Sequence, residues 1–384
     1  MIYKKTKYQI PFNKPHFTGH ELQYIKHAYS FGHLSGNGIY TKKCHEWIEK
    51  TIDCQKALLT HSCTSALEMM AVLCGIKPGN EIIMPSYTFV TTASSFVLRG
   101  GVPVFVDIRP DTLNINEDLI ENAITLRTKA IMVVHYAGVG CDMGKIMKIA
   151  KKHKLLVLED AAQAFLAKYK GKYLGTFGDL AAVSFHETKN IISGEGGSIL
   201  INNPKFKELS EVVWEKGTNR NKFLRGEVDK YTWVSLGSSY LPSEAVAAFL
   251  YAQLEKSGKI ISKRMKIWSK YHKGLLSLEK KGFIKRPVIP EECSHNGHIY
   301  YILLKDLEVR TKLIEFLKKR GILAVFHYIP LHSSPAGKKF GRKATSMKVT
   351  NRVVDTILRL PLYYEMTNND VKYVVDSVKD FFRK

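Results

Sequence analysis

The sequence lacks the long apolar runs that mark a membrane protein. No stretch reaches the about 18 consecutive apolar residues that a membrane-spanning helix needs. The basic first residues, Met1 to Lys14, also lack the apolar stretch of a secretion signal. We therefore expect a chain that has no membrane partner and resides in the cytoplasm.

Cysteine is sparse and is not clustered. The chain forms no C-x-x-C pair and no short cluster of cysteine with histidine; its six cysteines are Cys44, Cys54, Cys63, Cys74, Cys141 and Cys293. In a chain of 384 residues this spacing predicts free thiols rather than a disulfide framework. It also gives no indication of a metal site.

Acidic residues are few relative to basic ones. The chain has 35 Asp and Glu residues against 58 Lys and Arg residues, a formal net charge of +23. Such an excess can favour anionic partners, but the basic residues are spread along the chain, which is typical of a Lys-rich solvated surface. No segment resembles a helix-turn-helix, a zinc finger or an aromatic RNA-binding strand, so we expect no nucleic-acid partner.

The first two-thirds of the chain alternate short apolar runs with amphipathic segments. Continuous apolar runs separated by helices indicate a mainly parallel sheet that is buried on both faces. We expect helices over residues 65–74, 89–99 and 143–152, and strands over residues 57–60, 81–84, 103–106, 131–135, 155–159, 181–185 and 197–201.

The pattern changes from about Lys256 onward. A long basic helix is expected over residues 256–281, strands over 298–304 and 324–327, and helices over 310–320 and 369–382. The sequence thus predicts two domains, which the length of the chain also favours. They are a large α/β domain over residues 1–255, which includes the N-terminal segment, and a small α+β domain over residues 256–384.

Three segments at predicted strand ends carry residues suited to catalysis, and open α/β sheets bind ligands at this edge. Thr60 to Leu67 leads a strand into a helix through Ser and Thr residues, which suit either a bound phosphate or an ordinary helix cap. Asp160, after an apolar run, could hold a metal, a ribose hydroxyl or a ring N–H, or could cap a helix. Lys189, in a loop before several glycines, could attack a carbonyl as a buried amine or could be a surface lysine.

Taken together and in this order, the segments resemble the DegT/StrS group of sugar aminotransferases. The resemblance extends from Ile10 to Leu362 and is closest to the transaminases that make dTDP-4-amino-4,6-dideoxygalactose. It rests on MPSYTFV at 84–90, FHETKN at 185–190, EKGTNR at 215–220, DKYTW at 229–233, GSSYL at 237–241 and FHYIPLH at 326–332. It implies the type I fold of the enzymes that depend on pyridoxal 5′-phosphate (PLP), which is the fold of aspartate aminotransferase.

The resemblance also implies a cofactor, PLP, and a role for each matching residue. Lys189 is expected to hold PLP as a Schiff base and to move a proton during catalysis, while Asp160 pairs with the protonated pyridine nitrogen. Phe89 is expected to stack on the ring, and Gln163 to lie near its phenolic oxygen. The residues expected to bind the phosphate are Thr64, Ser65 and Ser184.

Further roles are implied for residues that follow. Many members of the group have an asparagine that reaches the cofactor phosphate of the neighbouring subunit, and Ser239 stands at that position here. The resemblance therefore implies a homodimer with shared active sites. Arg220 and His332 are implied contacts of the substrate.

The reaction implied by the resemblance transfers an amino group from L-glutamate to C4 of dTDP-4-keto-6-deoxy-D-glucose. The product would be dTDP-4-amino-4,6-dideoxygalactose, a precursor for a surface polysaccharide. Amination at C3, or of a UDP- or GDP-linked sugar, remains an alternative, as does a non-catalytic binding or regulatory protein on the same scaffold. The related 3-dehydratases have histidine in place of the lysine, so Lys189 argues against that activity.

Overall fold

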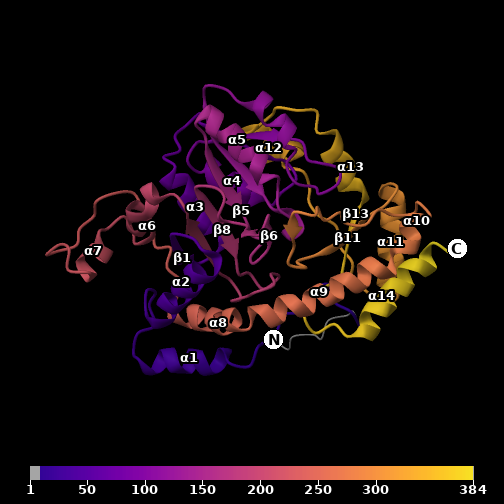
Figure 1. Cartoon of the computed structure of the whole chain (residues 1–384), viewed down its shortest axis with the longest axis horizontal. Coiled ribbons are helices and arrows are strands. Elements are labelled where there is room, and N and C mark those ends of the chain that lie inside the picture. The colour runs from indigo at the N-terminus through magenta and orange to yellow at the C-terminus, as the bar shows by residue number, and fades with distance from the viewer. Residues whose placement is uncertain (1–8, 384) are drawn as a thin grey trace.

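The computed structural model describes residues 9–383 of the chain, so Met1 to Tyr8 of the basic N-terminal segment lie outside the described residues. Its largest feature is an eight-stranded sheet with the order β1-β9-β8-β5-β4-β2-β3-β12 (Figure 1). The strands are β1 (Lys56–Thr60), β2 (Glu81–Pro85), β3 (Val102–Val106), β4 (Thr128–Val134), β5 (Leu156–Asp160), β8 (Leu180–Ser184), β9 (Gly197–Ile201) and β12 (Arg342–Lys343).

Most of the sheet is parallel, as the apolar runs predict. Strand β9 is antiparallel to both of its neighbours, β1 and β8, whereas all other adjacent strands are parallel. The carboxyl ends of seven strands therefore lie at one edge, where the amino end of β9 joins them. Seven of the eight strands coincide with predicted ones to within one to three residues at either end. The eighth strand, β12, comes from the C-terminal third of the chain.

Helices cover both faces of this sheet, which explains why its strands read as unbroken apolar runs. Along β1, Leu58 faces α3 (Cys63–Leu73), α4 (Val90–Val97) and α6 (Lys207–Trp214). The next residue, Leu59, faces α2 (Ile39–Ile52), α5 (Met143–His153) and α8 (Glu244–Glu255). Burial of consecutive residues on opposite faces follows from the two-residue repeat of a strand.

A second core forms around a two-stranded antiparallel sheet of β11 (Tyr300–Leu303) and β13 (Ile357–Leu360). Its helices are α9 (Ser257–Gly274), α10 (Leu276–Lys280), α11 (Leu307–Lys319) and α14 (Asn368–Phe381). The remaining α-helices and strands are α1 (Glu21–Ser30), α7 (Arg220–Leu224), α12 (Pro335–Phe340), α13 (Lys348–Thr356), β6 (Lys168–Tyr169), β7 (Lys172–Tyr173) and β10 (Cys293–Ser294).

Two expectations for the C-terminal third are wrong. The predicted helix over 256–281 is two helices, and the first ends at Gly274, where α14 packs so closely that a Cβ would lie 2.9 Å from Val375 Cγ1. The predicted strand over 324–327 is only a single bridge, in which Val325 pairs with Arg359. A short apolar run that pairs at one residue cannot be told from a strand by its pattern.

The two cores exchange segments across the predicted domain boundary. Ile10, from the N-terminal segment, packs in the second core and pairs with Ile322. Strand β12 runs the other way, from the C-terminal third into the large sheet. The division at residues 255 and 256 stays a prediction. Among the described residues, no helix combines the length and apolar character that crossing a membrane requires.

Candidate functional site

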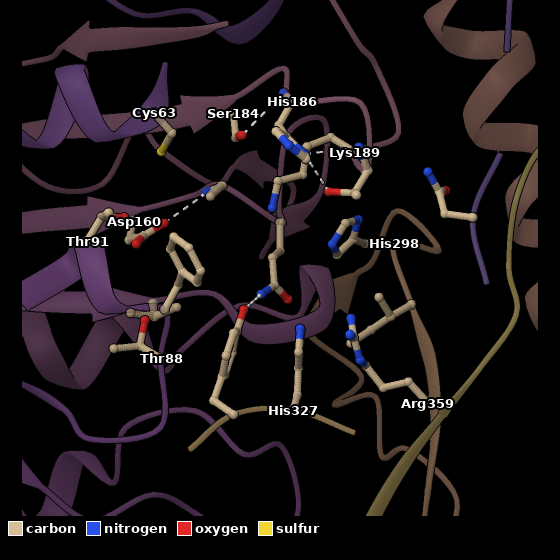
Figure 2. A pocket seen from close by; sticks show the side chains of 18 of the residues that line it. Cys63, Thr88, Thr91, Asp160, Ser184, His186, Lys189, His298, His327 and Arg359 are labelled. Carbon is tan, nitrogen blue, oxygen red and sulfur yellow. Dashed lines mark hydrogen bonds between the residues drawn. The ribbon is translucent and has the colours of Figure 1, made fainter. Parts of the chain in front are cut away.

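A pocket of about 600 Å³ opens at the edge of the large sheet where the parallel strands end. Residues that follow β1, β2, β5 and β8 line one side of it, and residues of the C-terminal third line the other. Figure 2 shows Cys63 and Asp160 on one side, with His298 and Arg359 opposite. Of the ten predicted site residues, Thr64, Phe89, Asp160, Gln163, Ser184 and Lys189 line this pocket.

The first part of the site is the N-terminus of α3. Ser62 caps this helix, because its Oγ accepts a hydrogen bond from the Ser65 N–H at 3.1 Å. The N–H groups of Cys63 and Thr64 follow in the first turn, where a helix provides no acceptor for them. Strand β9 begins against this turn, and a Cβ on Gly197 would lie 2.5 Å from Cys63 N. The turn therefore presents free N–H groups and the Thr64 side chain to the pocket, an arrangement that suits a phosphate.

The second part of the site is the carboxylate of Asp160, the last residue of β5. The residue is 5% exposed, and its carboxylate accepts hydrogen bonds from Thr92 Oγ1 at 2.7 Å and from the Ala162 N–H at 3.1 Å. Thr88 holds Thr92 in turn through a hydroxyl contact of 2.8 Å. These contacts fix the orientation of a buried carboxylate, which can pair with a cationic ring nitrogen.

The third part is the loop between β8 and β9, which carries Lys189. A backbone turn closes on the lysine, since its N–H donates to His186 O at 2.8 Å. Asn190 anchors the loop by donating to Asn296 O at 2.9 Å and by contacting His298 Nδ1 at 3.1 Å. Burial lowers the pKa of the Lys189 amine, and the positive charge of Arg359 lowers it further. A lowered pKa increases the fraction of neutral amine, the form that attacks a carbonyl.

Gln163 and Phe89 complete the side of the pocket that lies at the sheet edge. The Gln163 amide is held at both ends: Oε1 accepts from the Ala137 N–H at 2.8 Å, and Nε2 donates to the Tyr328 hydroxyl at 2.8 Å. Phe89 lies just before α4, is 55% exposed and has its ring centre 6.4 Å from that of Tyr328. An aromatic ring that is exposed into a pocket is available to stack on a planar ligand.

Sequence reasoning assigned no role to the residues on the opposite side. His298, His327 and Arg359 line the pocket there, together with Arg264 and Tyr328. Burial is the main cause that lowers the pKa of His298 and of His327, so both imidazoles are neutral near pH 7. His327 also stacks on Tyr328, with ring centres 3.8 Å apart. Among the strings that carry the resemblance, FHYIPLH at 326–332 contains His327 and Tyr328, and none contains Arg264 or His298.

Four predicted site residues lie outside the pocket of their own chain. Ser65 lies in the first turn of α3, where its N–H donates to the capping Ser62, and His332 is buried against Ser86, with 2.6 Å between Nδ1 and Oγ. Arg220 begins α7 and donates to Glu215 Oε1 at 2.8 Å, and Ser239 forms a bridge with the same Glu215. These four roles stay predictions.

The site shows no sign of a metal. Within residues 9–383, no group of three or more His, Cys, Asp or Glu side chains has an arrangement that could hold a metal ion. The chemistry of the pocket instead matches PLP. It offers helix N–H groups for the phosphate, a fixed carboxylate for the ring nitrogen, and an amine of lowered pKa for the aldehyde.

Comparison with known proteins agrees with this chemistry. The sequence pattern of the DegT/DnrJ/EryC1/StrS aminotransferase family matches residues 15–379. The spore coat polysaccharide biosynthesis protein SpsC of Bacillus subtilis is 30% identical over 391 residues, which cover 100% of this chain and 99% of that protein. GDP-perosamine synthase of Escherichia coli O157:H7 is 30% identical over 380 residues, which cover 97% of this chain and 98% of that protein.

A solved structure gives the same answer for fold and cofactor. Spr1654 of Streptococcus pneumoniae, described as a sugar aminotransferase and solved in a PLP form, superposes with a TM-score of 0.90 at 26% identity. The superposition covers 98% of this chain and 99% of that chain. It confirms the predicted type I fold and PLP as the cofactor. The chain is therefore a PLP-dependent sugar aminotransferase that belongs to the DegT/DnrJ/EryC1/StrS family.

Proposed function

We propose that this chain transfers the amino group of L-glutamate to C4 of dTDP-4-keto-6-deoxy-D-glucose, giving dTDP-4-amino-4,6-dideoxygalactose for a surface polysaccharide. The observation that carries the aminotransferase part is the amine of Lys189, which shares one pocket with the fixed carboxylate of Asp160. The family match supports amination of a sugar, and the name of the relative SpsC supports a role in polysaccharide synthesis. The choice of dTDP and of C4 rests on the sequence strings given above.

In this proposal each residue of the sheet edge has a defined task. When bound, PLP acts as an electron sink and carries the amino group from donor to acceptor. Thr64 and Ser184 bind its phosphate, Asp160 keeps a proton on its pyridine nitrogen, and Phe89 covers one face of its ring. Lys189 moves a proton to and from the substrate carbon. That task needs an amine in one step and an ammonium in the next, so a lowered pKa favours it.

A second substrate class has a specific observation in its favour. Relatives at about 30% identity include GDP-perosamine synthases of Escherichia coli and of Caulobacter vibrioides. A GDP-linked keto sugar is therefore the second candidate. The residues that line the pocket next to Lys189 serve the amination chemistry, which is common to both substrates, and do not distinguish the nucleotides.

The proposal includes a homodimer in the cytoplasm. Arg220 and Ser239 lie outside the pocket of their own chain, in a segment with large exposed apolar side chains such as Trp233, which is 76% exposed. Exposed aromatic side chains are enriched at protein interfaces. We propose that this segment docks on a second copy, so that Ser239 reaches the partner's cofactor phosphate and Arg220 reaches the substrate there. Ser65 remains proposed for the phosphate, and His332 for the substrate.

The test is incubation of the PLP-loaded protein with L-glutamate and, in separate reactions, with dTDP-4-keto-6-deoxy-D-glucose and a GDP-linked 4-keto-6-deoxy sugar. The expected result is an amino sugar from the dTDP compound, and the NMR coupling pattern of its ring protons identifies the aminated carbon and its configuration. A product from the GDP compound alone would reject the dTDP proposal in favour of the second candidate. Failure of the protein to bind PLP at all would reject both.

A further inference from the structure

The side-chain amide of Asn190, the residue that follows Lys189, is held in one orientation. Asn190 is 8% exposed, and its Nδ2 donates a hydrogen bond to the backbone carbonyl of Asn296 at 2.9 Å. A carbonyl oxygen can only accept, so the NH2 end of the amide must face Asn296. The oxygen end, Oδ1, then faces His298, with 3.1 Å to Nδ1. The chemistry of the two neighbours therefore assigns both ends of this amide.

The orientation of the amide decides which nitrogen of His298 carries the ring proton. Because Asn190 Oδ1 is an acceptor, His298 Nδ1 must be protonated in order to donate to it. Burial is the largest cause that holds the pKa of His298 well below its ordinary range, so the ring is neutral and has one proton. The charged and titratable groups that add to this lowering are those of Lys189, Arg264, Arg359 and His327. With the single proton on Nδ1, the other nitrogen, Nε2, keeps a free lone pair.

The backbone of His298 is fixed as well as its ring. Arg264, which is 3% exposed, donates from Nη2 to His298 O at 2.6 Å and from Nε to Gly297 O at 3.2 Å. The His298 N–H donates to Asn296 Oδ1 at 3.1 Å. Within residues 9–383 Nε2 makes no hydrogen bond, and the residue lines the pocket. A fixed ring thus presents an unused acceptor to the pocket.

Lys189 supplies N–H groups that suit this acceptor. Two adjacent residues of the loop between β8 and β9 act on the same ring, since Asn190 contacts Nδ1 and the charge of Lys189 lowers the pKa of the imidazole. Of the nearby charges, that of Lys189 has the largest effect on this pKa. Figure 2 shows the His298 ring between the labelled Lys189 and Arg359. A protonated lysine has three N–H donors and no acceptor, so it matches a lone pair and would be repelled by a ring N–H.

We propose that Asn190 is a positioning residue that keeps the His298 proton on Nδ1, so that Nε2 accepts a hydrogen bond from the Lys189 ammonium whenever the lysine is not bonded to the cofactor. The inference rests on the proposed role of Lys189. A neutral acceptor orients the ammonium but stabilises it less than a carboxylate does, so the lysine can still lose its proton. Proton transfer by Lys189 needs both the amine and the ammonium, and this arrangement keeps both accessible.

The position of the ring proton can be measured directly, without cofactor and without turnover. In PLP-free protein that contains ¹⁵N-labelled histidine, the NMR shifts of the two ring nitrogens show which of them is protonated. The signals of His298 are those that disappear in His298→Gln. We expect the proton on Nδ1 in the wild type and a shift of the proton toward Nε2 in Asn190→Ala. A wild-type proton on Nε2, or a proton that stays on Nδ1 in Asn190→Ala, would overturn the proposal.

Asn190→Asp separates the effect on the ring proton from the anchoring of the loop. A carboxylate still accepts from Nδ1, but it cannot donate to Asn296 O. At mildly alkaline pH, where an imidazole is neutral, Asn190→Asp should keep the proton on Nδ1, although it loses the same anchor as Asn190→Ala. If the proton left Nδ1 in both variants, the anchor rather than the acceptor would set the ring, and the proposal would fail.

The effect on Lys189 is measured as the pH dependence of its covalent capture of PLP, followed by borohydride reduction over a pH series. Without the acceptor the ammonium is less stable, so the midpoint of capture should fall by about one pH unit in Asn190→Ala. His298→Phe should lower the midpoint by a similar amount, and it keeps the test valid if Asn190→Ala folds poorly. The double variant should fall no further, because both changes remove the same hydrogen bond. His298→Gln offers an amide oxygen in place of Nε2 and should restore part of the shift.

Asn202 offers a matched control. Its Nδ2 also donates to backbone carbonyls, those of Gly175 and Gly178, both at 2.9 Å, but the residue does not line the pocket. Asn202→Ala should leave the His298 proton and the capture midpoint at wild-type values. Equal shifts in Asn202→Ala and Asn190→Ala would mean that loss of an amide that binds backbone, rather than loss of the acceptor for Lys189, is responsible.

Two further outcomes distinguish this proposal from the function on which it rests. An unchanged or raised midpoint in Asn190→Ala, or additive shifts in the double variant, would overturn the link from Asn190 through His298 to Lys189. Covalent capture of PLP by Lys189→Ala would instead reject the role of Lys189 itself. The NMR measurement contains neither PLP nor substrate, so its result on Asn190 and His298 would stand in that case.

Discussion

The two sides of the pocket differ in how the chain builds them. The sheet-edge side comes from residues that directly follow parallel strands, as Asp160 and Ser184 do. The opposite side comes from loops and a strand of the C-terminal third, including His298, His327 and Arg359. Strand ends of one parallel sheet must lie together, whereas the opposite side depends on how the second core packs against the sheet.

The two sides also differ in charge and chemistry. The sheet-edge side carries the fixed carboxylate of Asp160, together with free helix N–H groups and the reactive lysine. The opposite side carries arginines and imidazoles whose pKa values burial lowers. This contrast indicates that the sheet edge holds the cofactor, while the C-terminal side recognises what reacts with it. Three changes test this division of tasks.

Replacement of Lys189 by alanine should have the largest effect. Without the amine no group can move the proton, so turnover should fall by roughly 10,000-fold or more. The phosphate and ring contacts remain, and the protein should therefore still bind PLP, but borohydride should no longer attach the cofactor covalently. Mass spectrometry after reduction checks this point, with the exposed Lys305→Ala as control. Turnover close to that of the control would show that another residue carries the chemistry.

Replacement of Asp160 by asparagine should have the next largest effect. The ring nitrogen would lose its charge partner, so the rate of amination by glutamate should fall roughly 100- to 1,000-fold. Thr92→Val removes only one of the two hydrogen bonds that orient the carboxylate, and roughly a tenfold loss is expected. Single-turnover rates of amination in the two variants show which change causes the larger loss. If Thr92→Val were the more damaging change, the hydroxyl rather than the carboxylate would serve the ring.

The smallest expected effect is a shift in the pH dependence of PLP capture by Lys189. This shift depends on the charge of Arg359, on the opposite side of the pocket. Only the neutral amine of Lys189 reacts with the aldehyde of PLP, so the rate of covalent cofactor capture should rise as pH rises through the lysine pKa. Because burial lowers that pKa, the midpoint should lie below the ordinary value of 10.5. Arg359→Gln removes a charge that lowers the pKa, and the midpoint should move to higher pH.

That midpoint should nevertheless remain below the ordinary lysine value in Arg359→Gln, since burial is the larger cause. Capture rates of the PLP-free protein over a pH series measure both midpoints. Identical midpoints in the wild type and in the variant would show that Arg359 does not act on Lys189 across the pocket.

The sequence predicted most of the large sheet because local signals agree there. Each strand is an apolar run bounded by turn residues, and Gly197 stands where the start of β9 meets the turn of α3. Thr64, Asp160 and Lys189 could be placed at one edge by strand direction alone. The antiparallel direction of β9 was not predicted, because a short strand sequence carries no signal of its direction.

The sequence failed where a partner lies far along the chain. Nothing near Arg342 indicates that its strand joins β3, or that its guanidinium pairs with Glu81 at a separation of 261 residues. The same holds for Ile10, which packs in the second core, and for Val325, whose single bridge to Arg359 looked like a strand. Such pairings depend on the packing of whole elements, which local periodicity does not encode.

The order of strands and helices along the sequence was enough to predict a parallel sheet that brings a phosphate-binding turn, an acid and a lysine to one edge, because that order fixes strand direction. The residues that face this edge are known only from the folded chain. Folding buried the Lys189 amine so that its pKa falls, and it set Arg359, whose Nε has no hydrogen-bond partner among residues 9–383, on the opposite side of the pocket. Desolvation and charge depend on neighbours that come from the whole length of the chain, and these neighbours exist together only in the folded protein.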